Sequence, residues 1–182
     1  VKIFPGTIIE EYGEQLLQIL YENTQTATQI HHSNLIQVVE SGIAQDMFYV
    51  VLQYLQGQHV EQMLAESGTF LVEDVLYIGK EIAKALQAGH ETGLLHLDVR
   101  PRHIFISSDE NVKLAEFGTA MPIGDMTALS GNTVLLGHPH YIAPEQIKGQ
   151  GPLDPRTDLY SLGVSLFQML TGAPPYSGED IE

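Results

Sequence analysis

The chain has 182 residues, 43% of them hydrophobic, which is enough for one globular domain with a sizeable core. Its 23 acidic residues against 8 Lys and Arg give a net charge of -15, which disfavours nucleic acid and anionic membrane surfaces as partners because phosphate binding needs clustered bases. The lack of cysteine excludes disulfides and thiolate chemistry and agrees with the cytoplasmic location that we expect.

The first part of the chain predicts strands with one helical region between them. Residues 1–4 resemble the end of a β-strand, and because no Met starts the chain we expect residues before Val1. Residues 9–30 combine helix formers with apolar spacing and predict one or two helices. Two apolar, β-branched runs with turn-like residues between them then predict a hairpin, with runs at 35–39 and 47–54 and turns at 40–42 and 45–46.

The second part is mostly helical. A short helix is predicted from His59 to Ala65, and residues 72–90 predict a long amphipathic helix. Residues 118–140, rich in Gly, Thr, Pro and Met, predict a long loop, which in most proteins is functional or disordered. Three short strands lie between these elements, at 94–96, 104–106 and 112–114.

The last predicted helix covers residues 157–171, with Thr157 or Asp158 as its N-cap and Gly172 and Pro174-Pro175 after its end. The apolar stretch in this helix is too short and too often interrupted to insert into a membrane. Strands with one helix, followed mostly by helices, predict an α+β fold.

Two carboxylates, Asp98 and Glu116, lie at the edges of predicted short strands. Acids that converge in a cleft can hold a divalent cation and polarise a hydroxyl, as phosphoryl transfer requires. Taken alone, the pair is also compatible with two solvated loop residues.

The sequence around these acids resembles the protein kinase family, and the residues of its motifs are most similar to those of bacterial-type Ser/Thr kinases. Four motifs occur in the family's order. In the family they read H-R-D-x-K-P-x-N, D-F-G, G-T-P-x-Y-x-A-P-E and D-x-W/Y-S-x-G, and here they lie at 96–103, 116–118, 137–145 and 158–163. The resemblance implies one incomplete two-lobed domain over 1–182, with a small β-rich N-lobe (1–55) and a mostly helical C-lobe (56–182).

The resemblance also implies roles for single residues. Lys2 is implied to pair with the phosphates of ATP, and Asp98 to act as the base, with Arg100 at the position of the catalytic-loop lysine. Asp158 is implied to bond the catalytic-loop backbone, and Phe117 and His96 to stack in the spine between the lobes. The adenine site is implied to comprise Leu52 as gatekeeper, Gln53 to Leu55 as backbone contacts, and Phe105 under the ring; the Mg²⁺ positions are Glu116 and His103.

Several of these positions depart from the family pattern. His103 replaces the metal-binding Asn, and imidazole is a poor ligand for Mg²⁺. Glu116 replaces the Asp of D-F-G and adds a methylene, which displaces the carboxylate. Asn23 falls where the family has the helix Glu that pairs with Lys2, and a register shift could restore that carboxylate from Glu22.

Two further departures lie in the activation region. His138 stands at the Thr of G-T-P. Leu97 replaces the Arg that reads a phosphorylated loop, so we do not expect control through the hydroxyls of the following segment, which are Thr119, Thr127, Ser130 and Thr133.

Three functions follow as hypotheses. The favoured one is a pseudokinase-like signalling module that binds a protein partner, and ATP with Mg²⁺ weakly. The second is an active Ser/Thr kinase that phosphorylates protein substrates using Asp98 and Glu116. The third, a small-molecule phosphotransferase, is disfavoured by Ala143-Pro144-Glu145, while the pairs among the eight histidines lack the further ligands of a metal site.

Overall fold

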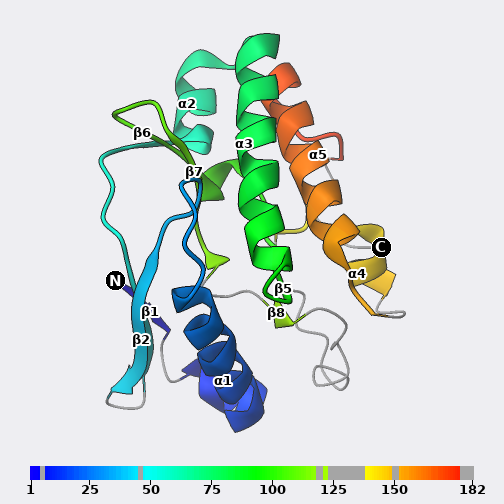
Figure 1. Cartoon of the computed structure of the whole chain (residues 1–182). Helices are drawn as coiled ribbons and strands as arrows, with labels where there is room; N and C mark the ends of the chain where they lie inside the picture. The colour runs from blue at the N-terminus through cyan, green and yellow to red at the C-terminus, as the bar shows by residue number, and fades with distance from the viewer. Residues whose placement is uncertain (5–6, 45–46, 118–120, 123–137, 149–151, 177–182) are drawn as a thin grey trace.

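Figure 1 shows a computed structural model of the chain, with a small sheet and helix α1 (Thr7–Thr28) on one side and the other helices on the other. The structure describes residues 1–4, 7–44, 47–117, 121–122, 138–148 and 152–176, with only the backbone for 7–17 and 121–122. The α+β architecture with a small β-sheet region and a helical region is confirmed. Within these ranges, no helix is long and apolar enough to cross a membrane.

The sheet is antiparallel with the strand order β1-β3-β2, formed by β1 (Lys2–Phe4), β2 (Val38–Ala44) and β3 (Met47–Leu52). Helix α1 (Thr7–Thr28) is one continuous helix that packs against β2 and β3. The predicted hairpin is confirmed, but the prediction of a turn at 40–42 is wrong. These residues pair with residues 49–51 as part of β2, because the ladder continues as far as Ala44 and Met47.

The helical region is built on α3 (Val72–His90) and α5 (Pro155–Thr171), which lie side by side in Figure 1. The short helices α2 (Val60–Ser67) and α4 (Pro144–Lys148) flank them. The predicted apolar face of α3 is confirmed, because its buried side chains recur at helical spacing. They are Val75, Ile78, Ile82, Ala85 and Leu86.

The predicted start of α5 is wrong by two residues. The N-cap is Asp154, whose Oδ1 accepts the N–H of Arg156 at 2.9 Å, and Pro155 occupies the first helical position. Thr157 and Asp158 are the wrong caps because both are buried inside the helix and their side chains bond to other segments. The end is as predicted, with Gly172 at φ 84° as the C-cap.

Short strands line the space between the two regions. The three-stranded order β4-β6-β7 joins β4 (Gly57–His59), β6 (Ile104–Ser107) and β7 (Val112–Leu114), and a 3-10 turn at Pro101–His103 precedes β6. Strand β5 (Leu94–Leu95) pairs with β8 (Met121–Pro122). These strands fix both ends of the segment 96–103, while most of the predicted loop 118–140 lies outside the described residues.

Candidate active site

The segment 96–103 is anchored by the fully buried side chain of Asp158 in α5. Its Oδ2 accepts the N–H of His96 at 2.8 Å and its Oδ1 accepts the N–H of Leu97 at 2.7 Å. His90, at the end of α3, places Nε2 2.8 Å from Oδ2. The implied contact between Asp158 and the loop backbone is therefore confirmed, and a single carboxylate joins α3, α5 and the loop.

His96 and Phe117 lie against one another, as the resemblance implied. Their ring centroids are 5.0 Å apart at 86°, and His96 Nε2 donates to the carbonyl of Ala115 at 2.6 Å. Leu97 and Glu116, which neighbour these rings, have positive φ values of 62° and 74°. Side-chain-bearing residues adopt such angles where surrounding contacts impose them, which is common in functional sites.

Leu97 lies in a small apolar cluster of its own. It is buried with Leu95 and Leu153, and Ile19 of α1 packs against the three. A charged side chain at this position would have to enter that cluster, so the apolar replacement suits the local packing. The segment holding Thr119, Thr127, Ser130 and Thr133 lies outside the described residues.

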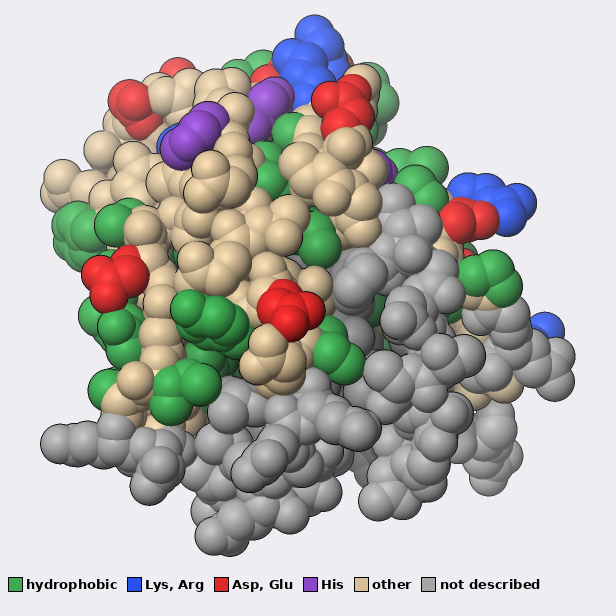
Figure 2. Space-filling model, turned by 60° about the horizontal axis from the view of Figure 1, so that its bottom comes forward, with side chains coloured by type: hydrophobic (Ala, Val, Ile, Leu, Met, Phe, Trp, Pro, Cys, Tyr) green, Lys and Arg blue, Asp and Glu red, His purple; other side chains and the backbone are tan. Residues whose placement is uncertain are grey.

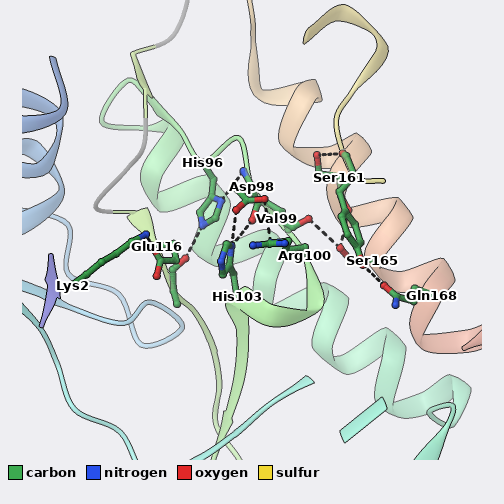
Figure 3. Close-up of polar contacts among 12 residues, drawn as sticks. Lys2, His96, Asp98, Val99, Arg100, His103, Glu116, Ser161, Ser165 and Gln168 are labelled. Atoms are coloured by element: carbon green, nitrogen blue, oxygen red, sulfur yellow. Dashed lines mark hydrogen bonds and ion pairs between the residues drawn. The ribbon is translucent and has the colours of Figure 1, made fainter. Parts of the chain in front are cut away.

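Asp98 lies between Arg100 and His103, as Figure 3 shows. Arg100 Nε is 3.3 Å from Asp98 Oδ1, and His103 Nδ1 is 3.2 Å from Asp98 Oδ2. The first contact has the distance of an ion pair without the alignment of a hydrogen bond. Both carboxylate oxygens therefore face groups of this same loop.

His103 is held as a neutral imidazole. Its Nδ1 lies 2.8 Å from the main-chain carbonyl of Asp98, and because a carbonyl only accepts, Nδ1 carries the proton. Burial lowers the pKa of His103 to about 4, although the nearby Asp98 carboxylate acts in the opposite direction. At neutral pH the side chain is uncharged and its bonding proton is already committed to the backbone.

Lys2 extends from β1 toward the loop and forms an ion pair with Glu116 Oε2 (Figure 3). Burial acts to raise the pKa of Glu116, but the Lys2 ammonium more than offsets that effect, so its pKa lies below the usual value. The glutamate is ionised at neutral pH. The resemblance assigned Lys2 to phosphate and Glu116 to metal, and a contact between the two was not predicted.

Helix α1 presents Asn23 inward and Glu22 outward. Asn23 is buried, whereas Glu22 is exposed and accepts a hydrogen bond from Gln18 Nε2 at 2.6 Å. The register shift that would have brought Glu22 to Lys2 is therefore absent. With an amide where the family has a carboxylate, Glu116 is the acid that Lys2 contacts.

The residues implied for adenine lie on the segment after β3 and on β6. Leu52 and Leu55 are half-buried, and Gln53 is exposed with its N–H donating to the carbonyl of Gln37 at 2.8 Å. Phe105 is buried, and its ring forms a T-shaped contact with the ring of His59, with 5.1 Å between centroids. The contact with His59 was not predicted, since it depends on the pairing of β4 with β6.

The motif at 137–145 ends in α4, where Glu145 Oε1 accepts the hydroxyl proton of Thr157 at 2.8 Å. His138 is near Arg100 and His140, and its pKa is lowered by burial first and then by those charges. Tyr141 donates its hydroxyl proton to Gln168 Oε1 of α5. The motif is thus fastened to α5 beside the catalytic loop.

Residues 7–182 match the protein kinase domain family. The chain belongs to that family. It is 34% identical over 167 residues to a probable serine/threonine-protein kinase of Clostridium perfringens, covering 92% of this chain and 24% of that protein. It is 32% identical over 155 residues to serine/threonine-protein kinase PrkC of Bacillus subtilis, covering 85% and 24%.

A third relative is serine/threonine-protein kinase PknL of Mycobacterium tuberculosis, 31% identical over 166 residues, or 91% of this chain and 41% of that protein. The expected likeness to bacterial Ser/Thr kinases is confirmed. The chain spans about a quarter of the length of the first two relatives. The kinase family in general uses ATP and Mg²⁺.

The donor set of this kinase-like site does not fit Mg²⁺ well. Mg²⁺ requires oxygen ligands in near-ideal octahedral geometry. His103 offers nitrogen, Glu116 is engaged by Lys2, and both oxygens of Asp98 face Arg100 and His103. Over the described ranges, no group of three or more His, Asp or Glu is arranged to hold a metal ion.

Proposed function

We propose that this chain is a Ser/Thr-kinase-like signalling module in which phosphoryl transfer is weak or absent. The observation that carries the proposal is the Lys2–Glu116 ion pair. It joins the group that the family uses for phosphate to the group that it uses for metal. Each neutralises the other, so ATP would have to separate them before either could act.

The position of His103 supports the same proposal. Phosphoryl transfer depends on positioning and on cations that neutralise the charge of the transferred group. A neutral imidazole that donates to the Asp98 backbone supplies neither a carboxamide oxygen nor a charge. The two family positions that bind metal are thus altered together.

A protein partner fits this reading as the ligand of the module. Asp158 holds α5 to the catalytic loop, and the Tyr141–Gln168 bond holds the motif at 138–145 to α5. These contacts support a scaffold for a partner segment in a site whose phosphate and metal positions depart from the family pattern. We propose the two-lobe division 1–55 and 56–182 for the same module.

The runner-up is an active Ser/Thr kinase that uses Asp98 as base, Arg100 beside it and Glu116 for metal. The intact Asp158 anchor favours it, because it holds the loop as an active site would need. For this function Lys2 must leave Glu116 when nucleotide binds. Adenine would then meet the segment from Leu52 to Leu55 and Phe105.

The test uses the full-length protein, with ATP binding measured by calorimetry and autophosphorylation by radiolabelled ATP. Both assays are run with Mg²⁺ and with Mn²⁺ on wild type and on Asp98→Asn. We expect weak nucleotide binding and transfer that does not exceed the Asp98→Asn background. Robust transfer in wild type that is lost in Asp98→Asn would establish the active kinase instead.

A further inference from the structure

A groove of about 580 Å³ lies behind the segment that follows β3, away from the catalytic loop. Its walls come from the loop between α1 and β2, from β2 itself, from the start of that segment and from β7. In Figure 1 the loop runs beside β7, and a parallel bridge joins Leu35 to Leu114. The side chains that matter are His31, His32, Leu35, Val39, Gln53 and Lys113.

The groove differs in charge from the rest of the chain. The sequence carries 23 acids against 8 Lys and Arg, and Figure 2 shows acidic side chains spread singly over one face of the molecule. No Asp or Glu is among the described residues that line the groove, whereas Lys113 and two imidazoles are. The Lys113 ammonium is therefore a local positive charge on an acidic protein, and a lining with this charge and no carboxylate favours a negatively charged ligand.

Lys113 is held in place for such a ligand. Its Nζ donates to the carbonyl of Ser33 at 2.7 Å and more weakly to that of Leu35 at 3.4 Å. An ammonium has three donors, so the two described bonds leave one N–H of Lys113 for a ligand in the groove that this side chain lines. Fixing the ammonium beforehand removes part of the entropy cost of binding.

His31 is fixed in the same way, since its Nδ1 lies 2.8 Å from Gln37 Oε1. His32 Nδ1 accepts the N–H of Asn34 at 3.1 Å, so its Nε2 carries the proton in the neutral ring and can donate. Gln37 Nε2 in turn donates to the carbonyls of Thr28 and Val38. The polar wall is therefore ordered by hydrogen bonds within the loop.

The apolar part of the groove is formed by Leu35, which is buried, and Val39, which is 59% exposed. Val39 sits at the irregularity in the β2–β3 ladder between Val38 and Glu40. His31, Ser33 and Gln53 are also exposed, so the groove is open along one side. An open groove cannot enclose a small ligand, which usually has most of its surface buried, but it can take an extended chain.

We propose that this groove binds an acidic peptide segment of a partner protein, with carboxylates at Lys113 and His32 and an apolar side chain on Leu35 and Val39. Binding here does not depend on phosphoryl transfer, so the inference goes beyond the proposed function. Within the groove, the N–H of Gln53 donates to the carbonyl of Gln37. A bound segment would contact the sheet region at Val39 and the helical region at Lys113.

The test is fluorescence anisotropy of a labelled peptide Glu-Glu-Leu-Glu-Glu titrated with the full-length protein at low salt. The control peptide is Gln-Gln-Leu-Gln-Gln. We expect the acidic peptide to bind at least roughly tenfold tighter than the neutral one, with the difference shrinking as salt is added. Equal binding of the two peptides, or no binding of the acidic one, would overturn the proposal.

Two matched substitutions in one strand locate the site. Val39 and Ile43 are both exposed apolar residues of β2, but only Val39 lines the groove. Val39→Glu should weaken acidic-peptide binding by about threefold to tenfold and Val39→Lys should strengthen it similarly, whereas Ile43→Glu should leave it unchanged. If both glutamate variants behave alike, the peptide binds elsewhere and the proposal fails.

Two further measurements separate the charge and the kind of ligand. Lys113→Met should abolish the preference for the acidic peptide, Lys113→Arg should retain it, and Lys80→Met, an exposed lysine of α3 outside the groove, should have no effect. Inorganic phosphate and glutarate should compete only at concentrations at least about a hundredfold higher than the peptide. Competition at equal concentrations would show a small-anion site and contradict the peptide.

Discussion

His103 is the residue whose burial has the clearest consequence for stability. Its pKa in the folded protein is about 4, below its ordinary value of 6.5, so folding favours the neutral ring. The resulting stability is fully present above pH 6.5 and is lost as the pH falls toward 4, by on the order of 3 kcal/mol. In urea unfolding across this range, wild type should lose stability more steeply than His103→Asn; parallel curves would show that the ring is not held neutral.

The Lys2–Glu116 pair makes a second prediction for single residues. Glu116→Gln removes the charge that holds Lys2 and frees its ammonium for phosphate. Affinity for metal-free ATP should rise roughly threefold to tenfold, because a partly exposed ion pair is worth about 1 kcal/mol. Binding is measured by calorimetry, with Glu110→Gln as the control at an exposed acid. An unchanged or lower affinity would mean that the pair does not restrain Lys2.

Among the helices, α5 owes more to a buried acid than to its N-cap. Asp158→Ala would leave the N–H groups of His96 and Leu97 buried without their acceptor, at a cost of about 3–5 kcal/mol. Asp154→Ala removes only the half-buried cap, which costs about 1 kcal/mol. Chemical denaturation should therefore rank Asp158→Ala well below Asp154→Ala in stability, and equal losses would contradict the anchoring role.

Helix α3 approaches Phe117 through a glycine. A Cβ at Gly89 would lie 2.3 Å from two atoms of the Phe117 ring, whereas a Cβ at Gly163 of α5 meets no described atom within 4 Å. Gly89→Ala should lower thermal stability by about 1–3 kcal/mol, since the core cannot yield without moving the ring. Gly163→Ala should be neutral or stabilising by up to about 1 kcal/mol. The melting temperatures of the two variants test this difference. A Gly89→Ala variant as stable as wild type would contradict the tight packing of α3 against Phe117.

Much of the fold could be predicted from local patterns. Helix α3 matches its predicted bounds because its apolar spacing is regular, whereas the contact of Asp158 with the loop was implied by the family resemblance. The start of α5 could not be predicted, because Thr157 and Asp158 have the chemistry of caps but are used in tertiary contacts. Local chemistry identifies candidates, whereas packing decides between them.

The candidate site shows the same limit more strongly. The sequence identified Glu116 and His103 as departures from the family pattern. It also identified Asn23 as the position at which the family's helix Glu is replaced. It did not predict that Lys2 would contact Glu116, because those residues are 114 positions apart and meet only when β1 is placed against the helical region. The one available signal was that Lys2 had lost its usual partner.

At the scale of the whole molecule, a kinase scaffold is retained while the groups that handle phosphate and metal are altered. The anchor at Asp158 and the contact between His96 and Phe117 hold the catalytic loop in the helical region, and the Lys2–Glu116 ion pair joins that region to the sheet. The groove behind the segment after β3 adds positive charge to an otherwise acidic chain. Such a molecule is suited to holding partners in defined positions, which is the signalling role that we propose.

The most direct test is to restore the family residues in the full-length protein. Radiolabel transfer from Mg²⁺-ATP is compared between wild type and Glu116→Asp/His103→Asn, each with and without Asp98→Asn. We expect the double variant to transfer radiolabel at least about tenfold faster than wild type and to lose that gain with Asp98→Asn, which would show that the altered residues cause the weak transfer. Wild-type transfer that equals or exceeds that of the double variant, and depends on Asp98, would contradict the account.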